Sequence, residues 1–341
     1  MRRLEKRQQV AAAIQSDAQS LLQLSLTKAF VILNPSSASG ATGRAWPHVA
    51  SELRTHFGPF EVSFTERRGD AINLATEAVR SGSELIIACG GDGTISEVAN
   101  GILNSGNDVE LAILPSGTGG DFRRTLNIPA RARDAARIIR VGKTRRIDVG
   151  RATFISRSGH QVTRHFLGVA SFGMSADIIE RVKRGRGQWL RNYGAHSLTG
   201  RISFGISMIE TAVKSTATRV IVKLDEDHER HLTVANLCIA NARYFGGGMK
   251  IAPEAKINDG RFDVVSIGDL GALSILTNAP RLYAGAHLGM DKVAHVLAKR
   301  VQARPVAPEE EILLELDGEL PGRLPSTFQI VPAALRVRCP S

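Results

Sequence analysis

Residues 90–94 form a glycine-rich segment with the sequence Gly-Gly-Asp-Gly-Thr, shortly after an apolar run at residues 85–88. Glycine lets backbone N–H groups come close to a phosphate, and the positive end of a following helix, expected to begin near Ile95, attracts the same anion. Thr94 is expected to cap that helix, and Glu97 to complete a capping box. A tight strand-to-helix turn without a ligand is the structural alternative. The segment therefore indicates a phosphate-binding turn at the end of a strand.

Asp92 is the residue of this segment that does not suit a phosphate. A carboxylate beside phosphate groups is repulsive unless a metal ion or another cation lies between them. We therefore expect Asp92 to belong to a magnesium-linked network.

A second segment rich in glycine and hydroxyl groups, residues 115–122, follows the apolar run at residues 111–114. In open parallel sheets ligands collect beyond the carboxyl ends of the strands, so the two glycine-rich segments are expected to face each other. The spacing of a Walker loop is absent, and so is the dinucleotide fingerprint in its required context. Together the two segments predict a nucleotide site of another type.

Two Asp-Gly pairs occur in the second half of the chain. Asp317-Gly318-Glu319 follows a strand-like run at residues 311–316, and Asn258-Asp259-Gly260 lies further upstream. Phosphoryl transfer to a hydroxyl needs a carboxylate that accepts the hydroxyl proton. Asp-Gly is also among the strongest β-hairpin signals. From spacing alone, a structural turn is the favoured interpretation of both pairs.

The pattern of apolar residues, which predicts the strands and helices that position these segments, changes along the chain. Apolar runs at 30–33, 85–88 and 111–114 alternate with helix-like stretches, which is typical of parallel strands buried on both faces. After about residue 150, segments rich in β-branched residues, such as 218–224 and 231–240, favour antiparallel strands. We expect a basic helical extension at residues 1–27, an α/β domain at 28–150 and a β-rich domain at 151–327, with residues 328–341 returning to the α/β domain.

The order of these segments resembles the diacylglycerol kinase catalytic family. The match rests on Asn34-Pro35, on residues 90–94 and on residues 115–122, and it extends over nearly the whole chain after residue 28. Within the family the chain is most similar to the soluble bacterial lipid kinases of the YegS and diacylglycerol kinase type. The resemblance implies an α/β N-terminal domain with a parallel sheet similar to that of phosphofructokinase and NAD kinase. It also implies a mainly antiparallel β-sandwich lipid domain, with ATP in the cleft between the two.

The resemblance further implies which residues bind the nucleotide. They belong to the loops that follow the strands of the first domain: Asn34, Thr65, Gly90, Gly91, Asp92, Gly93, Thr94, Ile95, Ser96, Glu97, Gly117 and Thr118. Most of the family has asparagine where this chain has Gly120, so a side-chain amide is missing from the second loop.

By the same resemblance, Asp317 is the general base and Glu319 supports it. The aromatic and glycine-rich residues 241–249 are similar to the family segment that approaches the cleft, although a glycine loop joining two strands is the alternative. The expected catalytic carboxylates thus come from the second domain, opposite the phosphate-binding loops.

Residues 256–261 resemble the family loop that holds a structural magnesium ion. In this interpretation Asp259 supplies a carboxylate oxygen, while Lys256 and Arg261 contribute backbone carbonyls, because their cationic side chains cannot ligate a metal. Waters and an indirect link to Asp92 and Asp148 would complete the shell. Asp148 is equally well explained as an ordinary strand-end residue.

The chain has 341 residues and a net charge of +11, which favours an anionic partner: nucleic acid, an anionic membrane surface or an acidic substrate. Basic residues at 181–186 run into Trp189 and Tyr193, a combination that suits a surface resting on anionic lipid, although a solvated helical face is the alternative. No run is long enough to span a membrane, and no secretory signal is apparent. We expect a cytoplasmic protein that associates peripherally with membranes. No nucleic-acid partner is expected, and a homodimer is possible.

The expected function is that of an ATP- and Mg²⁺-dependent lipid kinase, which transfers the γ-phosphate to the hydroxyl of diacylglycerol or a related lipid. One alternative is an enzyme similar to NAD kinase, which shares the Gly-Gly-Asp-Gly turn but lacks the second loop and the late Asp-Gly-Glu. Another is a catalytically silent membrane-binding relative. The identity of the lipid is not encoded in these motifs.

Overall fold

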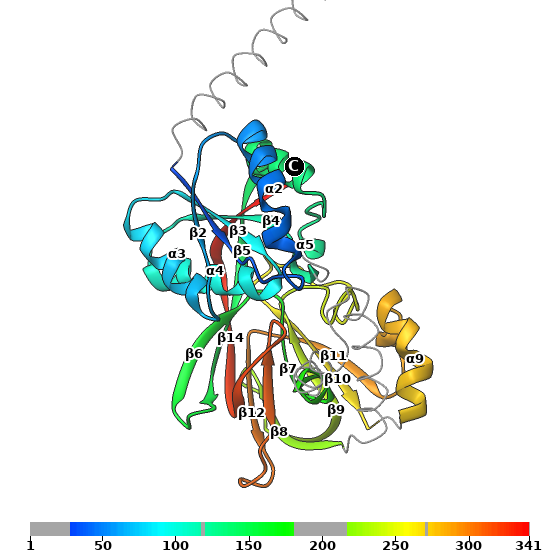
Figure 1. The fold of residues 1–341 in the computed structure, drawn as a ribbon. Coiled ribbons are helices and arrows are strands. Elements are labelled where there is room, and N and C mark those ends of the chain that lie inside the picture. The colour runs from blue at the N-terminus through cyan, green and yellow to red at the C-terminus, as the bar shows by residue number, and fades with distance from the viewer. Residues whose placement is uncertain (1–27, 117–119, 181–216, 270–271, 341) are drawn as a thin grey trace, which may run out of the picture.

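The computed structural model describes residues 28–116, 120–180, 217–269 and 272–340 (Figure 1). The expected helical extension at 1–27 and the basic and aromatic cluster at 181–193 lie outside the described residues. The same holds for Gly117 and Thr118 of the second glycine-rich segment.

The first half of the chain alternates strands and helices. Its strands pair in parallel in the order β2-β1-β3-β4, and β3 is buried along its whole length because helices cover both faces. The apolar runs predicted as strands lie in β1, β3 and β4. The elements are β1 (Ala29–Leu33), α2 (Ala41–His56), β2 (Glu61–Phe64), α3 (Asp70–Arg80), β3 (Leu85–Gly90), α4 (Asp92–Ser105), β4 (Glu110–Pro115), α5 (Asp121–Thr125) and α6 (Ala132–Val141).

Helices α3 and α4 pack against each other at very short range. A Cβ atom at Gly101 would lie only 2.4 Å from the carbonyl oxygen of Ile72, so glycine is what allows the two backbones to approach. This contact matters for the site, because α4 begins at the first glycine-rich turn and α3 follows the loop after β2.

The second half is antiparallel, as predicted. Buried aromatic rings fill its core, among them Phe166 and Phe262, which stack with their centroids 5.6 Å apart. Its strands are β5 (Lys143–Ser156), β6 (Gln161–Phe166), β7 (Val169–Gly173), β8 (Thr218–Leu224), β9 (Arg230–Ala240), β10 (Phe262–Gly268), β11 (Val293–Ala298), β12 (Arg300–Pro305), β13 (Leu313–Leu316) and β14 (Glu319–Cys339).

A helix, α9 (Ala272–Ala284), and a 3₁₀ turn, η1 (His287–Gly289), lie beside these strands (Figure 1). Among the described residues, no helix is both apolar enough and long enough to cross a membrane.

The two long strands β5 and β14 connect the halves. The start of β14 pairs with β13 and its middle with β12, whereas Arg336 and Val337 near its end pair with β4 of the first half. Strand β5 accompanies β14 over most of this length, so the boundary expected near residue 150 lies inside a strand (Figure 1). Because these strands are shared, the β13–β14 turn is held in a fixed position relative to the first half.

Candidate active site

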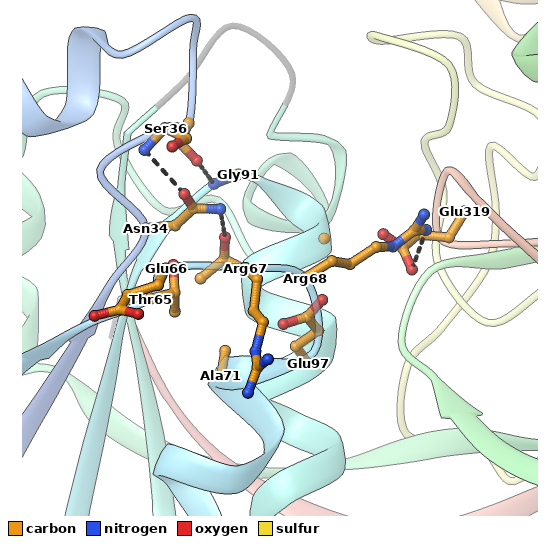
Figure 2. A pocket seen from close by; sticks show the side chains of 13 residues that line it. Asn34, Ser36, Thr65, Glu66, Arg67, Arg68, Ala71, Gly91, Glu97 and Glu319 are labelled. Atoms are coloured by element: carbon orange, nitrogen blue, oxygen red, sulfur yellow. Dashed lines mark hydrogen bonds and ion pairs between the residues drawn. The ribbon is translucent and has the colours of Figure 1, made fainter. Parts of the chain in front are cut away.

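A pocket of about 290 Å³ opens where the loops after β1, β2 and β3 meet the start of β14 (Figure 2). Most of the lining residues carry hydroxyl, amide or charged side chains or are glycines, so the pocket is polar. The lining residues are Asn34, Ser36, Ser37, Thr65, Glu66, Arg67, Arg68, Ala71, Gly91, Gly93, Thr94, Glu97 and Glu319. The structure thus brings six of the predicted nucleotide-site residues together with the predicted catalytic Glu319.

The first glycine-rich turn starts α4 earlier than expected, at Asp92 instead of Ile95. Gly91 is the N-cap residue and no side chain caps the helix, so the predicted capping box is wrong. The physical reason is that both side chains serve neighbouring loops. Thr94 Oγ1 accepts a hydrogen bond from Asn34 Nδ2 (3.2 Å), and Glu97 Oε1 accepts one from the Gly69 N–H (3.0 Å).

Glycine at position 90 makes this arrangement possible. A Cβ atom there would lie 2.6 Å from Thr94 Oγ1, so a larger residue would displace the threonine from its contact with Asn34. The Gly91 N–H, which points toward the β1 loop, donates to Ser37 Oγ (3.3 Å; Figure 2 shows this loop). The turn is therefore fixed by side chains that come from the two adjacent loops.

Asp92 connects the two glycine-rich segments directly. Its carboxylate accepts hydrogen bonds from the N–H groups of Gly120 (2.8 Å), Asp121 (3.0 Å) and Phe122 (3.2 Å), at the start of α5. Sequence reasoning missed this contact and assigned the carboxylate to a magnesium-linked network, which stays a prediction. The contact explains how an acidic residue is accommodated beside a phosphate-binding turn, because three amide dipoles offset its charge.

Gly120 has a left-handed backbone conformation, with φ of +72°. Glycine adopts this conformation freely, and asparagine is among the few other residues that tolerate it. Glycine in place of the asparagine that the family resemblance leads us to expect is therefore compatible with this conformation at position 120 and removes only the side-chain amide.

Asp317 and Gly318 form the two-residue turn between β13 and β14, both with positive φ (48° and 82°), as in a type I′ hairpin. The structural interpretation of this pair is therefore confirmed. The Asp317 carboxylate is nonetheless directed inward, where it accepts hydrogen bonds from the N–H groups of Leu167 (2.9 Å) and Gly168 (2.8 Å). A side chain at Gly168 would collide with Asp317, since its Cβ atom would lie 2.9 Å from Oδ1.

Ser96 on α4 lies close enough to the Asp317 carboxyl to lower its pKa. Burial raises the pKa of the Asp317 carboxyl, and the two N–H donors and Ser96 oppose this effect by stabilising the carboxylate. The predicted base of the second half thus lies beside the helix that starts at the phosphate-binding turn.

Glu319 lies at the edge of the pocket and carries two arginine partners. Its Oε2 is 2.6 Å from Arg68 Nη2 and 3.3 Å from Arg164 Nη1 (Figure 2 shows the Arg68 pair). Its Oε1 faces Gly93, at 3.7 Å from where a Cβ atom would stand. Neither arginine was identified from the sequence: Arg68 lies shortly after Thr65 but outside the recognised segments, and Arg164 is near none of them.

Glu97 is the second buried carboxylate of this cluster. Burial raises its pKa, the hydrogen bond from Gly69 lowers it, the negative charge of Glu319 raises it and Arg164 lowers it. Two carboxylates and two guanidinium groups therefore interact electrostatically beside the phosphate-binding turn.

The predicted magnesium loop at residues 256–261 is fixed by Asp148. Asp148 accepts hydrogen bonds from the N–H groups of Gly260 (2.6 Å) and Ala333 (2.8 Å), and its own N–H donates to the Ile257 carbonyl (2.6 Å). Both oxygens of Asp148 thus accept a backbone N–H, and Asp148 lies inside β5 and not at a strand end, while its indirect link to magnesium stays a prediction. Asp148 clamps the loop against the end of β14.

The loop nevertheless has donor chemistry that fits a hard cation. Asp259 exposes its carboxylate, and its charge, with that of Glu254, raises the pKa of the neighbouring Asp263, so the local potential is negative. Burial is the largest cause of that raised pKa. Within the described parts of the chain, no three His, Cys, Asp or Glu side chains gather as a metal cluster, so any ion here would need backbone carbonyls and water as well.

The aromatic and glycine-rich segment at residues 241–249 docks on α5. The Gly247 N–H donates to Asp121 Oδ2 (2.7 Å), and Arg124 forms an ion pair with the other oxygen of Asp121 (2.6 Å). Burial raises the pKa of Asp121, and the N–H of Gly247 opposes this. The second glycine-rich segment is therefore tied to the first segment through Asp92 and to the β-rich half through Asp121.

Comparisons with known proteins agree over both halves. The diacylglycerol kinase catalytic domain matches residues 28–152, and the YegS C-terminal NAD kinase beta sandwich-like domain matches residues 168–339. A diacylglycerol kinase of Mycobacterium tuberculosis (strain ATCC 25618 / H37Rv) is 29% identical over 92% of this chain and 95% of its own length. The diacylglycerol kinase of Bacillus subtilis (strain 168) is 27% identical over 89% of this chain and 93% of its own.

Two solved structures from Bacillus anthracis str. Sterne share the fold. One has a TM-score of 0.70 at 25% identity, and the other, of a diacylglycerol kinase, has a TM-score of 0.64 at 22% identity. Each comparison covers 92% of this chain and 97% of the solved chain. With both domain matches in sequence order and the loops meeting at one pocket, this chain belongs to the diacylglycerol kinase catalytic domain family, a family of kinase-type phosphotransferases, and carries the YegS-type C-terminal domain.

Proposed function

We propose that this protein is an ATP-dependent lipid kinase that transfers the γ-phosphate to the hydroxyl of diacylglycerol or a related lipid. The observation that carries the proposal is that Glu319, beside Asp317 in the β13–β14 turn, lines one pocket with Gly91, Gly93 and Thr94. This turn brings carboxylates from the β-rich half to the helix that begins at Gly91-Asp92, where Ser96 lowers the pKa of Asp317. A hydroxyl acceptor held on the β-rich half would then meet the phosphate donor at this junction.

ATP, when bound, supplies the phosphoryl group. Asn34, Thr65, the residues from Gly90 to Glu97, and the second segment with Gly117 and Thr118 would hold its phosphates, because they offer backbone N–H groups, hydroxyls and an amide at the ends of neighbouring strands. Thr65, which is buried directly after β2, lines the pocket.

Asp317 would act as the general base by accepting the hydroxyl proton of the lipid on its carboxylate. Burial raises its pKa and so brings the group closer to the pH at which the enzyme works, which strengthens a base. The hydrogen bonds from Leu167 and Gly168 hold the carboxylate in one orientation. Glu319 would support this step from the neighbouring position in the turn.

Magnesium would be held by Lys256, Asp259 and Arg261, through one carboxylate and two backbone carbonyls. An ion there would supply fixed positive charge next to the clamp that Asp148 forms with Gly260 and Ala333.

We further propose an anionic bilayer as the place where the enzyme meets its lipid, with the protein in the cytoplasm and attached peripherally. The net charge of +11 supports this, because a basic protein is attracted to anionic lipid.

The test is incubation with radiolabelled ATP and magnesium against a panel of hydroxylated lipids plus NAD, followed by chromatography. Labelled diacylglycerol or a related lipid supports the proposal, whereas labelled NAD with unlabelled lipids would overturn it. The Asp317→Asn variant should lose nearly all turnover while still binding ATP. Retained turnover in this variant would remove Asp317 from the role of base.

A further inference from the structure

The pocket is short of cations for a nucleotide site. Its lining contains three carboxylates, from Glu66, Glu97 and Glu319, but only two guanidinium groups, from Arg67 and Arg68. Phosphoryl transfer requires positive charge around the transferring group, and arginine is well suited to supply it because its fork binds two phosphate oxygens at once.

The two arginines differ in direction. Arg67 is 87% exposed and its Nε binds Asp70 Oδ1 (3.2 Å) within its own loop. Arg68 instead reaches across the pocket to Glu319 in the other half of the molecule (2.6 Å; Figure 2). Of the two arginines, Arg68 is therefore the one that links the phosphate-binding loops to the turn that carries the predicted catalytic residues.

The backbone that carries Arg68 is held firmly, although its side chain is not. Asp70 Oδ2 accepts hydrogen bonds from the N–H groups of Glu66 (3.0 Å) and Arg67 (2.8 Å), and Glu97 accepts one from Gly69 (3.0 Å). The side chain of Arg68 is 57% exposed, so it can rotate without disturbing packed neighbours. An ion pair with this much exposure is weak, so a triphosphate with several negative charges is a competitive alternative partner.

Glu319 has a second cationic partner besides Arg68. The same oxygen, Oε2, is also bound by Arg164, which comes from β6 and is not part of the pocket lining. If Arg68 moved away, Arg164 would still hold Glu319 in place beside Asp317. The Glu319 carboxylate would then have one ion-pair partner fewer.

We propose that Arg68 exchanges partners during the reaction: it pairs with Glu319 when the pocket holds no nucleotide, and it binds the terminal phosphate of ATP when the pocket is filled. The inference rests on the proposed function, since it takes ATP as the donor. Nucleotide binding would thereby release Glu319 at the place where the acceptor hydroxyl reacts. Arg68 is then a catalytic residue that contacts the donor and Arg164 a positioning residue for Glu319.

The exchange makes an unusual prediction about nucleotide affinity. Removing the competitor by Glu319→Gln should tighten ATP binding by about two- to five-fold, the value of an exposed ion pair. Removing the arginine by Arg68→Gln should weaken ATP binding by roughly tenfold, as expected for a charge-assisted hydrogen bond, and should weaken ADP binding less because ADP lacks the terminal phosphate.

The double variant separates the exchange from simple repulsion between Glu319 and the phosphates. If Arg68 carries the effect, Glu319→Gln should give no more than a marginal gain in the Arg68→Gln background. Arg164→Gln is the matched control: it removes the other guanidinium on the same carboxylate oxygen, and it should change ATP affinity much less than Arg68→Gln.

The measurement is calorimetric titration of the full-length protein with ATP and with ADP in the presence of magnesium, with thermal melting to verify that each variant folds. An equal gain from Glu319→Gln in both backgrounds would overturn the exchange and leave the proposed function standing, and so would equal losses of ATP and ADP affinity in Arg68→Gln. No ATP binding by the unaltered protein would overturn the proposed function and the exchange together.

Discussion

Asn100 of α4 binds the backbone of His165 in β6 through both ends of its amide: its Nδ2 donates to the His165 carbonyl oxygen and its Oδ1 accepts from the His165 N–H, each at 2.9 Å. Asn100 is 2% exposed, so these two contacts lie away from water. They fasten the helix that begins at the phosphate-binding turn to the strand that leads to Leu167 and Gly168, the donors to Asp317.

This relationship predicts a large effect for Asn100→Ala. The change leaves the partly buried N–H and carbonyl of His165 without these partners, so the free energy of unfolding should fall by about 1–3 kcal/mol. Chemical denaturation measures this. Asn107→Ala, at an exposed position in the loop before β4, is the control and should stay within about 0.5 kcal/mol of the unaltered protein. Equal stability of the two variants would mean that the amide pair does not hold the halves together.

The raised pKa of Asp317 predicts that the rate of the reaction depends on pH. Because burial raises its pKa above the ordinary aspartate value of 3.8, a base at this position is protonated, and inactive, at a higher pH than an exposed aspartate would be. The rate constant kcat should therefore fall as the pH is lowered, with the midpoint of the acidic limb above 3.8. Initial rates at saturating ATP and lipid between about pH 4 and 8 check this. A rate independent of pH across that range would contradict the assignment.

Asp92 predicts coupling between the two glycine-rich segments. Asp92→Ala removes the acceptor of three N–H groups at the start of α5, and a hydrogen bond to a charged group contributes about 1.5–3 kcal/mol. We expect a stability loss of at least this size together with weaker ATP binding, because the second segment loses its anchor. Asp92→Asn keeps one acceptor oxygen and should lose less of both. Calorimetry and denaturation measure the two effects, and an unchanged ATP affinity in Asp92→Ala would separate the segments functionally.

The strands and the phosphate-binding turn could be predicted from the sequence because their signals are local. Buried parallel strands leave continuous apolar runs, as in Leu85–Gly90, and the glycines after them mark the turn. The pair Asp317-Gly318 has one role that the local sequence predicts and another that depends on residues far away in the chain. The hairpin interpretation follows from two adjacent residues, whereas the position of Asp317 beside a helix from the other half could be anticipated only through the family resemblance.

The helix start and the contacts across the two halves could not be predicted in this way. Thr94 and Glu97 have the spacing of a capping box, but each meets a better partner from another loop, and no local pattern reveals such partners. Arg68 and Glu319 are separated by 251 positions, so nothing near either residue indicates the other. Asn100 did leave a signal, since a polar side chain inside the apolar stretch Val98–Ile102 of a buried helix must find a hydrogen-bond partner.

The loop at residues 256–261 makes a prediction about magnesium that does not depend on activity. An ion bound there would stabilise the folded protein by mass action, so adding magnesium should raise the melting temperature, and a chelator should reverse the rise. Asp259→Ala should abolish the rise, because it removes the one carboxylate that the loop offers, while Asp148 still clamps the backbone through Gly260 and Ala333. Asp269→Ala, an exposed aspartate after β10, is the matched control and should leave the rise intact. If both variants kept the rise in full, the ion would bind elsewhere, and the negative potential around Asp259 and Asp263 would serve only to hold His295, whose Nε2 lies 2.7 Å from Asp263 Oδ1.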